Sequence, residues 1–258
     1  MQKFTPSDQE REFSFLVAEY LRRPNLQALP EGQRQLISLV LWKLLASSSR
    51  AIAGALETMT KRLQGVLEES APQDLVETLD EDYESLDETA EEWEEENEPN
   101  LLTTDEYHAI ADEIDELKHF KTLAENIRED AKSCALLTAL STAFDKLKEL
   151  GAAQKAIIFT ESKRTQDYLL ECLTQTLYAG ENGDGIVLFN GTNNDAQAQK
   201  IYKDWLKRHE GSDKITGSKT ADTRAALVEH FKDRGCIMIA TEAAAEGINL
   251  QFCSMLVN

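Results

Sequence analysis

Hydrophobic residues in the first 65 positions recur three or four residues apart, which is the spacing of a helix. The first stripe consists of Phe13, Leu16, Val17, Tyr20 and Leu21. Ser7 precedes this stripe and Glu10 follows three positions later, which is the capping-box pattern of a helix N-terminus. A more apolar stretch, QLISLVLWKLLA from Gln35, contains Lys43 and is too short to span a bilayer. It predicts a buried helix, and residues 1–65 are expected to be all-helical.

A second helical pattern covers residues 104–150. Thr103 and Glu106 repeat the capping-box spacing at its start. The apolar face then runs through Ile110, Ile114 and Leu117. The segment predicts one long helix or a helix pair with a break near Asp130, since no β-branched run of strand length occurs before residue 155.

The pattern changes at residue 151, where short apolar runs begin to alternate with helical stripes. The expected strands are KAIIFT, GIVLFNG, CIMIAT and SMLVN, and the helices between them are RTQDYLLECLTQTL, NNDAQAQKIYKDWLKRHE and DTRAALVEHFKDRG. Near-continuous apolar strands that alternate with helices indicate a parallel sheet covered on both faces. The fold class expected for residues 151–258 is therefore α/β. In such sheets ligands bind at the carboxyl ends of the strands.

Charge is distributed unevenly along the chain. The net charge is −20 over 258 residues, but residues 66–130 hold 25 acidic and 3 basic residues, and the rest holds 22 and 24. The centre of this block has few aliphatic residues, so residues 66–103 are expected to form an acidic insertion or linker. Two interpretations stay open. The insertion is either simply solvated, or it binds a basic protein surface or mimics nucleic acid.

Cysteine and histidine spacing gives little sign of metal chemistry. The four cysteines form no CxxC pair and are expected to be small buried residues, and the histidines show no HExxH spacing. Nothing at the N-terminus resembles a signal peptide. These observations predict a cytoplasmic protein with no bound metal and no membrane association.

The loops after the expected strands contain the candidate functional residues. After the third strand, Thr241 offers a hydroxyl, and an alanine run leads to Gly247, where small residues permit close approach of a ligand. Alternatively, Thr241 caps a helix that begins at Glu242, and Asn249 satisfies local backbone groups.

The loop after the first expected strand offers a second candidate. Ser162 precedes Lys163 and Arg164 at an expected helix N-terminus, where phosphate binds well. Alternatively, Ser162 is only a cap and both bases are solvated. After the second strand, Asn190 and Gly191 either contact a ligand or form a tight turn.

Two strings imitate phosphate or magnesium motifs. DEYH from Asp105 follows no buried apolar strand, so a helix start is the better interpretation. In TGSKT from Thr216, Ser218 separates Gly217 from Lys219, so the order required of a phosphate loop fails. Neither string is assigned a function.

The strings IIFT, GIVLFNGTNND and above all ATEAAAEGINLQ occur in the order of motifs in superfamily 2 helicases. Residues 151–258 resemble the C-terminal RecA-like lobe (P-loop NTPase-type) of these helicases and translocases, in a bacterial Swi/Snf branch. Residues 1–65 resemble the helical segment that joins the two lobes. The resemblance implies that the partner is nucleic acid, namely duplex DNA. The implied contacts are at Thr160, Ser162, Lys163, Arg164, Asn190, Gly191 and Thr241. The resemblance also implies coupling to the nucleotide cleft by Glu246, Gly247 and Asn249.

The resemblance further implies that an intact protein binds ATP and Mg²⁺ and couples hydrolysis to movement along DNA. The family's first lobe and the arginines that follow the last strand have no counterpart in residues 1–258. We therefore expect a truncated lobe and a chain that has no catalytic residues of its own and is inactive as an ATPase. Two alternatives are a non-catalytic module that binds a basic protein through its acidic insertion and an unrelated phosphate-binding α/β domain.

Overall fold

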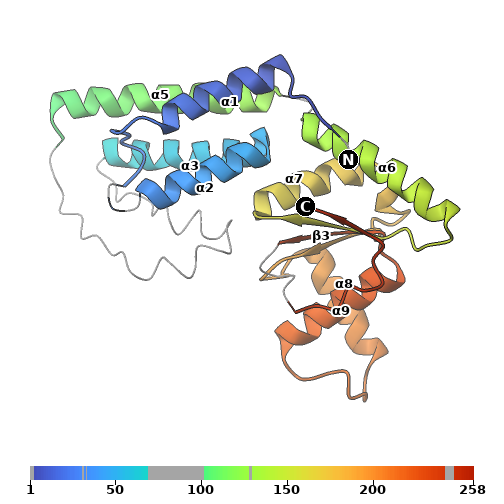
Figure 1. Ribbon diagram of the computed structural model, residues 1–258. Coiled ribbons are helices and arrows are strands. Elements are labelled where there is room, and N and C mark those ends of the chain that lie inside the picture. The colour runs from blue at the N-terminus through green and yellow to red at the C-terminus, as the bar shows by residue number, and fades with distance from the viewer. Residues whose placement is uncertain (1–2, 31, 33, 69–101, 128–129, 242–246) are drawn as a thin grey trace. The chain divides into compact units, whose positions relative to one another are not determined.

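The computed structural model describes residues 3–30, 32, 34–68, 102–127, 130–241 and 247–258. The chain divides into two compact units (Figure 1). Lys3 to Cys134 form a helical unit, and Ala135 to Asn258 form a sheet unit. Within the described ranges, none of the helices is long and apolar enough to cross a bilayer.

The helical unit consists of α1 (Asp8–Leu21), α2 (Arg34–Ser47), α3 (Ser49–Leu67) and α5 (Thr104–Asn126). In Figure 1, α1 lies along α5, and α2 lies along α3. Both predicted capping boxes are confirmed, because Ser7 and Thr103 cap α1 and α5 with Glu10 and Glu106 at the third helical position. The DEYH string therefore lies in the first turn of a helix.

One buried carboxylate ties this unit together. Glu113 of α5 accepts a hydrogen bond from the Tyr20 hydroxyl at 2.6 Å and from the backbone N–H groups of Gln27 at 2.8 Å and Ala28 at 3.1 Å. Burial, together with the Glu113 charge, raises the pKa of Tyr20. The carboxylate thus joins α1, the loop after it and α5.

The apolar stretch in α2 is only partly buried. Its buried face consists of Ile37, Val40, Leu41 and Leu44. Leu39 is 56% exposed, so the predicted buried helix is buried on one face only. A helix at the surface of a small unit buries one face only, and a run that is apolar on all sides does not show which face that is.

The sheet unit contains four parallel strands in the order β2 (Ile186–Phe189), β3 (Ile237–Thr241), β1 (Ala156–Thr160) and β4 (Met255–Val257). All four expected strands are present, and the α/β fold class is confirmed. Side chains alternate between the two faces, as a strand requires. One face packs against α8 (Ala196–Arg208) and α9 (Lys219–Asp233).

The other face of the sheet packs against α6 (Ala131–Glu149), α7 (Lys163–Thr174) and the short helix η2 (Leu177–Ala179). Leu140 and Phe144 of α6 are part of this core. The sheet unit therefore begins at Ala135, earlier than the predicted residue 151. The periodicity of α6 shows a helix but does not show what the helix packs against.

The cysteines differ from expectation. Cys134 is exposed, and Cys172, Cys236 and Cys253 are only partly buried. Burial raises the pKa of the Cys236 and Cys253 thiols.

Candidate functional site

Three strands end at the same edge of the sheet. The parallel register places Thr160 opposite Thr241 and Phe189 opposite Ala240, so the loops after β1, β2 and β3 leave the sheet together. This is the carboxyl edge, where α/β sheets bind ligands. The predicted residues Thr160, Asn190 and Thr241 are therefore brought together, and all three are buried.

At the end of β1, the polar side chains are held by the protein itself. The Thr160 hydroxyl donates to the carbonyl of Ser162 at 3.2 Å. The Ser162 hydroxyl accepts from the backbone N–H of Thr165 at 3.1 Å and caps α7, which confirms the cap interpretation. Lys163 and Arg164 begin the helix and are partly buried rather than fully solvated.

Gln166 is a site residue that sequence reasoning missed. It is 1% exposed, and its amide nitrogen donates to the carbonyls of Ile239 at 2.8 Å and Phe189 at 3.2 Å. Its amide oxygen accepts from the side chain of Asn190 at 2.9 Å. A glutamine in the first turn of an amphipathic helix looks like a surface residue, and nothing in the local sequence distinguishes it. It fixes the ends of β2 and β3 relative to α7.

The loop after β2 is a closed turn. The Asn190 N–H donates to the Asn193 side chain at 2.9 Å, and the Asn193 N–H donates to the Asn190 side chain at 2.8 Å. Asn193 has a positive φ of 44°, a conformation that asparagine tolerates better than most residues. Asp195 then caps α8. The turn interpretation of Asn190 is confirmed, and Gly191 lies exposed within the turn.

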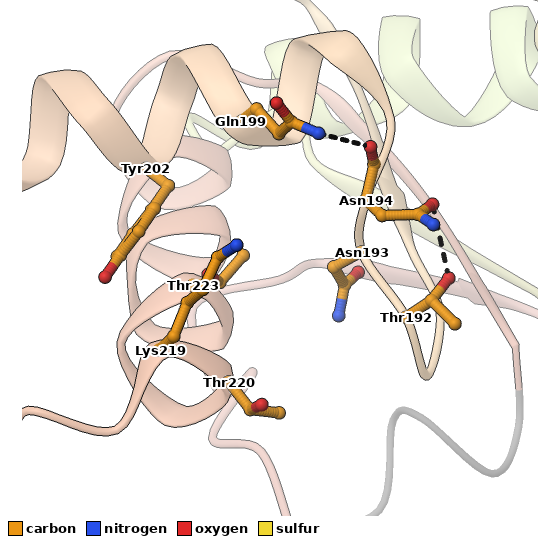
Figure 2. A pocket seen from close by; sticks show the side chains of 8 residues that line it. All are labelled: Thr192, Asn193, Asn194, Gln199, Tyr202, Lys219, Thr220 and Thr223. Atoms are coloured by element: carbon orange, nitrogen blue, oxygen red, sulfur yellow. Dashed lines mark hydrogen bonds between the residues drawn. The ribbon is translucent and has the colours of Figure 1, made fainter.

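Beside this turn lies a polar pocket of about 210 Å³. Figure 2 shows the turn after β2 on one side and α9 on the other, with α8 contributing the third wall. The lining residues are Thr192, Asn193, Asn194, Gln199, Tyr202, Lys219, Thr220 and Thr223. Most of these were not singled out from the sequence, because they come from three segments that only the fold brings together.

Several side chains of the pocket have unused hydrogen-bonding capacity. Among the described residues, the Lys219 ammonium and the hydroxyls of Thr220 and Thr223 have no hydrogen-bond partner or counter-ion. Thr223 is only 7% exposed as a residue, and its unpaired hydroxyl is not among the fully buried polar atoms, so it is accessible from the pocket. The pocket therefore offers donors to a ligand.

The TGSKT string does not cradle phosphate, because a carboxylate of the protein occupies it. Asp222 accepts from the N–H of Thr216 at 2.9 Å, from its hydroxyl at 2.7 Å and from the N–H of Gly217 at 3.2 Å. The hydrogen bonds from Thr216 lower the pKa of Asp222. Ser218 then caps α9.

A second carboxylate of α9 holds the loop between α8 and α9. Glu229 contacts Arg208 at 2.9 Å, His209 at 2.8 Å and Lys214 at 3.3 Å, and it accepts from the Trp205 indole at 3.2 Å. Burial acts to raise the pKa of Glu229, but hydrogen bonds from His209, Trp205 and Lys214 outweigh it and lower the pKa to about 2. The two helices that line the pocket are thus clamped together.

The loop after β3 is described only from Gly247 onward. Gly247 has a φ of +76°, and a Cβ atom there would meet nothing within 4 Å, so the glycine is required by its backbone conformation. The Asn249 side chain accepts from the N–H of Gln251 at 3.2 Å, which agrees with a local backbone role. Glu246 and the alanine run lie outside the described residues, as does the acidic segment from residue 69 to residue 101.

Comparisons with known proteins bear on the sheet unit. The family described as "Helicase conserved C-terminal domain" matches residues 168–258. These residues form a domain similar to a helicase C-terminal lobe. An uncharacterized ATP-dependent helicase, YqhH of Bacillus subtilis (strain 168), is 35% identical over 104 residues. That alignment covers 40% of this chain and 13% of YqhH, and no solved structure matches.

The match to the helicase lobe divides the candidate residues. Asn190, Gly191, Thr241, Gly247 and Asn249 lie within it, together with the whole pocket. The residues after β1, from Thr160 to Arg164, precede it. In the described parts of this chain, no group of three or more His, Cys, Asp or Glu side chains is placed to hold a metal ion.

Proposed function

We propose that this chain is part of a nucleic-acid-dependent ATPase, a helicase or translocase of the Swi/Snf type, and that its sheet unit contacts the nucleic-acid backbone. The helicase-lobe match and the ATP-dependent helicase among its relatives support the class. The observation that carries the contact is the polar pocket at the carboxyl edge, with its unpaired Lys219 ammonium and its unpaired Thr223 hydroxyl.

The chemistry of the pocket suits a phosphodiester backbone. Phosphate oxygens accept from ammonium, hydroxyl and amide donors, and such contacts hold a strand without reading its sequence. Lys219 supplies a positive charge, while Thr192, Thr220 and Thr223 supply hydroxyls. Lys219 and Thr220 also occupy the first two positions of α9, where the helix dipole favours an anion.

The residues predicted from the sequence take different parts in this proposal. The side chains of Thr160, Ser162 and Asn190 form internal hydrogen bonds, so we assign them to holding the strand-end loops in place. Direct contacts by Lys163, Arg164, Gly191 and Thr241 stay predictions. So does coupling to a nucleotide cleft by Glu246, Gly247 and Asn249.

The activity of the whole protein is also a proposal. This chain spans about 13% of the length of YqhH. The proposal includes ATP with Mg²⁺, a first RecA-like lobe, duplex DNA as the track and a cytoplasmic location. A basic protein partner for the acidic segment stays a prediction from its charge.

The test is Lys219→Gln in the complete natural protein. We expect affinity for duplex DNA to fall about threefold to tenfold and the salt dependence to lose the equivalent of about one phosphate contact. DNA-stimulated ATP hydrolysis should fall in parallel at limiting DNA. Fluorescence anisotropy over a salt series and phosphate release measure the two effects.

Lys232→Gln is the matched control. It removes the same charge from an exposed position at the other end of α9. DNA affinity should then stay at the parental value. Equal effects of the two substitutions, or no effect of either, would reject the pocket as the contact.

A further inference from the structure

Asn193, in the wall of the pocket, has a side-chain amide of which only one atom is in use. The residue is 5% exposed, and its Oδ1 atom accepts from the backbone N–H of Asn190 at 2.9 Å. Its Nδ2 atom has no hydrogen-bond partner in the part of the chain that the structure describes. This nitrogen is not among the fully buried unpaired atoms, so a ligand can reach it. Asn193 therefore keeps one donor available.

The direction of this donor is fixed by the backbone. A backbone N–H can only donate, so the amide atom of Asn193 that faces the Asn190 N–H is the oxygen. The nitrogen lies on the other side of the amide, and Asn193 lines the pocket. Figure 2 shows the nitrogen in the space between the turn after β2 and α9. The available donor therefore faces the pocket.

A chain of paired amides holds Asn193 in this orientation. Gln166 donates to the carbonyls of Phe189 at 3.2 Å and Ile239 at 2.8 Å. Because carbonyls can only accept, Gln166 presents its amide oxygen to Asn190, whose Nδ2 atom donates to it at 2.9 Å. The Asn190 oxygen then accepts from the Asn193 N–H at 2.8 Å. Each amide in the chain has one orientation that satisfies its neighbours.

The turn by itself does not need an asparagine at position 193. Its φ of 44° is a conformation that Asn, Asp and Gly adopt more readily than most residues. Aspartate could accept from the Asn190 N–H equally well, because that bond uses a side-chain oxygen. Asparagine differs from aspartate in the donor that faces the pocket. That donor is therefore the feature of Asn193 that the turn leaves unexplained.

We propose that Asn193 donates a hydrogen bond from Nδ2 to a phosphate oxygen of nucleic acid in the pocket, and that Gln166, acting through Asn190, is the positioning residue for this contact. The proposal rests on the proposed function, because it adds a contact in the same pocket. Asparagine side chains are among the usual donors to phosphate oxygens. Lys219 brings a mobile charge from α9, and Asn193 brings a hydrogen bond of fixed direction from the turn.

The first test is Asn193→Asp in the complete natural protein. Aspartate keeps the shape, tolerates the positive φ and keeps the oxygen that accepts from Asn190, but it replaces the donor with an anionic oxygen. We expect affinity for duplex DNA to fall about tenfold or more, because a hydrogen bond is lost and a like charge faces the phosphate. The melting temperature should change little. Fluorescence anisotropy and thermal melting measure the two effects.

Asn194→Asp is the matched control for the added charge. Asn194 is the next residue and also lines the pocket, but it is exposed, and its side chain accepts from the Thr192 hydroxyl at 3.4 Å. The new charge acts on DNA only through space and is screened by solvent, so affinity should fall about threefold or less. Equal losses in the two variants would indicate general repulsion and overturn the proposal. So would parental affinity in Asn193→Asp.

The second test is Gln166→Met, which removes three hydrogen bonds with a side chain of similar size. At temperatures where the variant is folded, affinity should fall about threefold to fivefold, the effect of one lost hydrogen bond. The salt slope should not change, because no charge is removed. The loss should not add to that of Asn193→Asp, because both act on the same contact.

Leu173→Ala is the control for general destabilisation of α7. Leu173 is fully buried on the same helix and takes no part in the amide chain. This variant should melt at a lower temperature, but the folded protein should bind DNA with parental affinity. Equal losses of affinity in Leu173→Ala and Gln166→Met would show that Gln166 acts only through the stability of the fold and would overturn its positioning role.

Failure of this proposal is distinguishable from failure of the proposed function. If Lys219→Gln weakens DNA binding while Asn193→Asp behaves like Asn194→Asp, the pocket stands and the Asn193 contact is wrong. If the parental protein does not bind DNA at all, both fall.

Discussion

The polar side chains at the centre of the helical unit and those around the pocket of the sheet unit differ in hydrogen bonding. Glu113 in the helical unit receives three hydrogen bonds, from Tyr20, Gln27 and Ala28. At the carboxyl edge of the sheet, the inner residues Gln166 and Asn190 are also paired. Farther out, the Thr223 hydroxyl is open to the pocket and has no partner among the described residues.

This difference separates two uses of a polar side chain. A fully paired group holds elements in position, and removing it leaves its partners unsatisfied. An unpaired donor in a pocket contributes nothing to folding and is available to a ligand. Hydrogen-bond pairing, and not burial or polarity alone, therefore distinguishes the supporting residues of the carboxyl edge from its candidate contacts.

The largest expected effect is from Glu113→Ala. It would leave a hydroxyl and two backbone N–H groups buried without an acceptor, at a cost of about 3 kcal/mol or more. Hydrogen exchange should show loss of protection in α1, the loop after it and α5. At temperatures where the helical unit of the Glu113→Ala variant stays folded, DNA binding by its sheet unit should persist.

Glu116→Ala is the control on the same helix. Glu116 forms a partly exposed ion pair with Arg23 at 2.6 Å, which is worth about 1 kcal/mol or less. If Glu113→Ala cost no more than Glu116→Ala, the interpretation of Glu113 as the tie between α1 and α5 would fail.

The elements were easier to predict than the site, for a physical reason. Strands and helix caps are encoded by residues a few positions apart, so IIFT, IMIAT and the Thr103–Glu106 pair were recognisable. The pocket is assembled from residues 192 to 223, and its members become neighbours only through packing of α8 and α9. No local pattern contains that information.

Gln166 and Leu39 are two residues whose burial differs from what the sequence suggests, in opposite directions. Gln166 looks like a surface glutamine and is buried, because its amide completes the ends of two strands. Leu39 looks like a core residue and is exposed, because its helix turns another face inward. The loop motifs placed the candidate residues after three different strands, and the parallel register shows that these strands end at the same edge.

An intermediate effect is expected from Glu229→Gln, and it depends on pH. The pKa of Glu229 is lowered to about 2 in the folded state, so the charged carboxylate stabilises the fold above its ordinary pKa. That stabilisation should be about 1–2 kcal/mol near neutral pH, and it should disappear as the pH falls from about 5 to 2. Thermal melting of both proteins across this range measures the difference.

The same pH series tests the source of the effect. Glu229 faces Arg208, His209 and Lys214, and glutamine keeps the shape but not the charge. A gap between parent and variant that stayed constant down to pH 2 would show that the carboxylate charge is not what clamps α8 to α9.

The smallest effect on stability, and the sharpest comparison of the two units, comes from Thr223→Val and Thr60→Val. Both threonines are 7% exposed, but the Thr60 hydroxyl donates to the Leu56 carbonyl at 2.8 Å, whereas Thr223 has no partner in the described structure. Thr60→Val should cost about 1 kcal/mol and leave DNA binding unchanged.

Thr223→Val should change the free energy of unfolding by less than about 0.5 kcal/mol, because valine keeps the branched shape and no hydrogen bond is lost. DNA affinity should nevertheless fall about threefold to fivefold, the value of one hydrogen bond to a phosphate oxygen. Urea unfolding and anisotropy titration of both variants decide the matter: a Thr223→Val protein that is destabilised but binds DNA normally would make Thr223 a structural residue like Thr60 and leave the pocket without this hydroxyl donor.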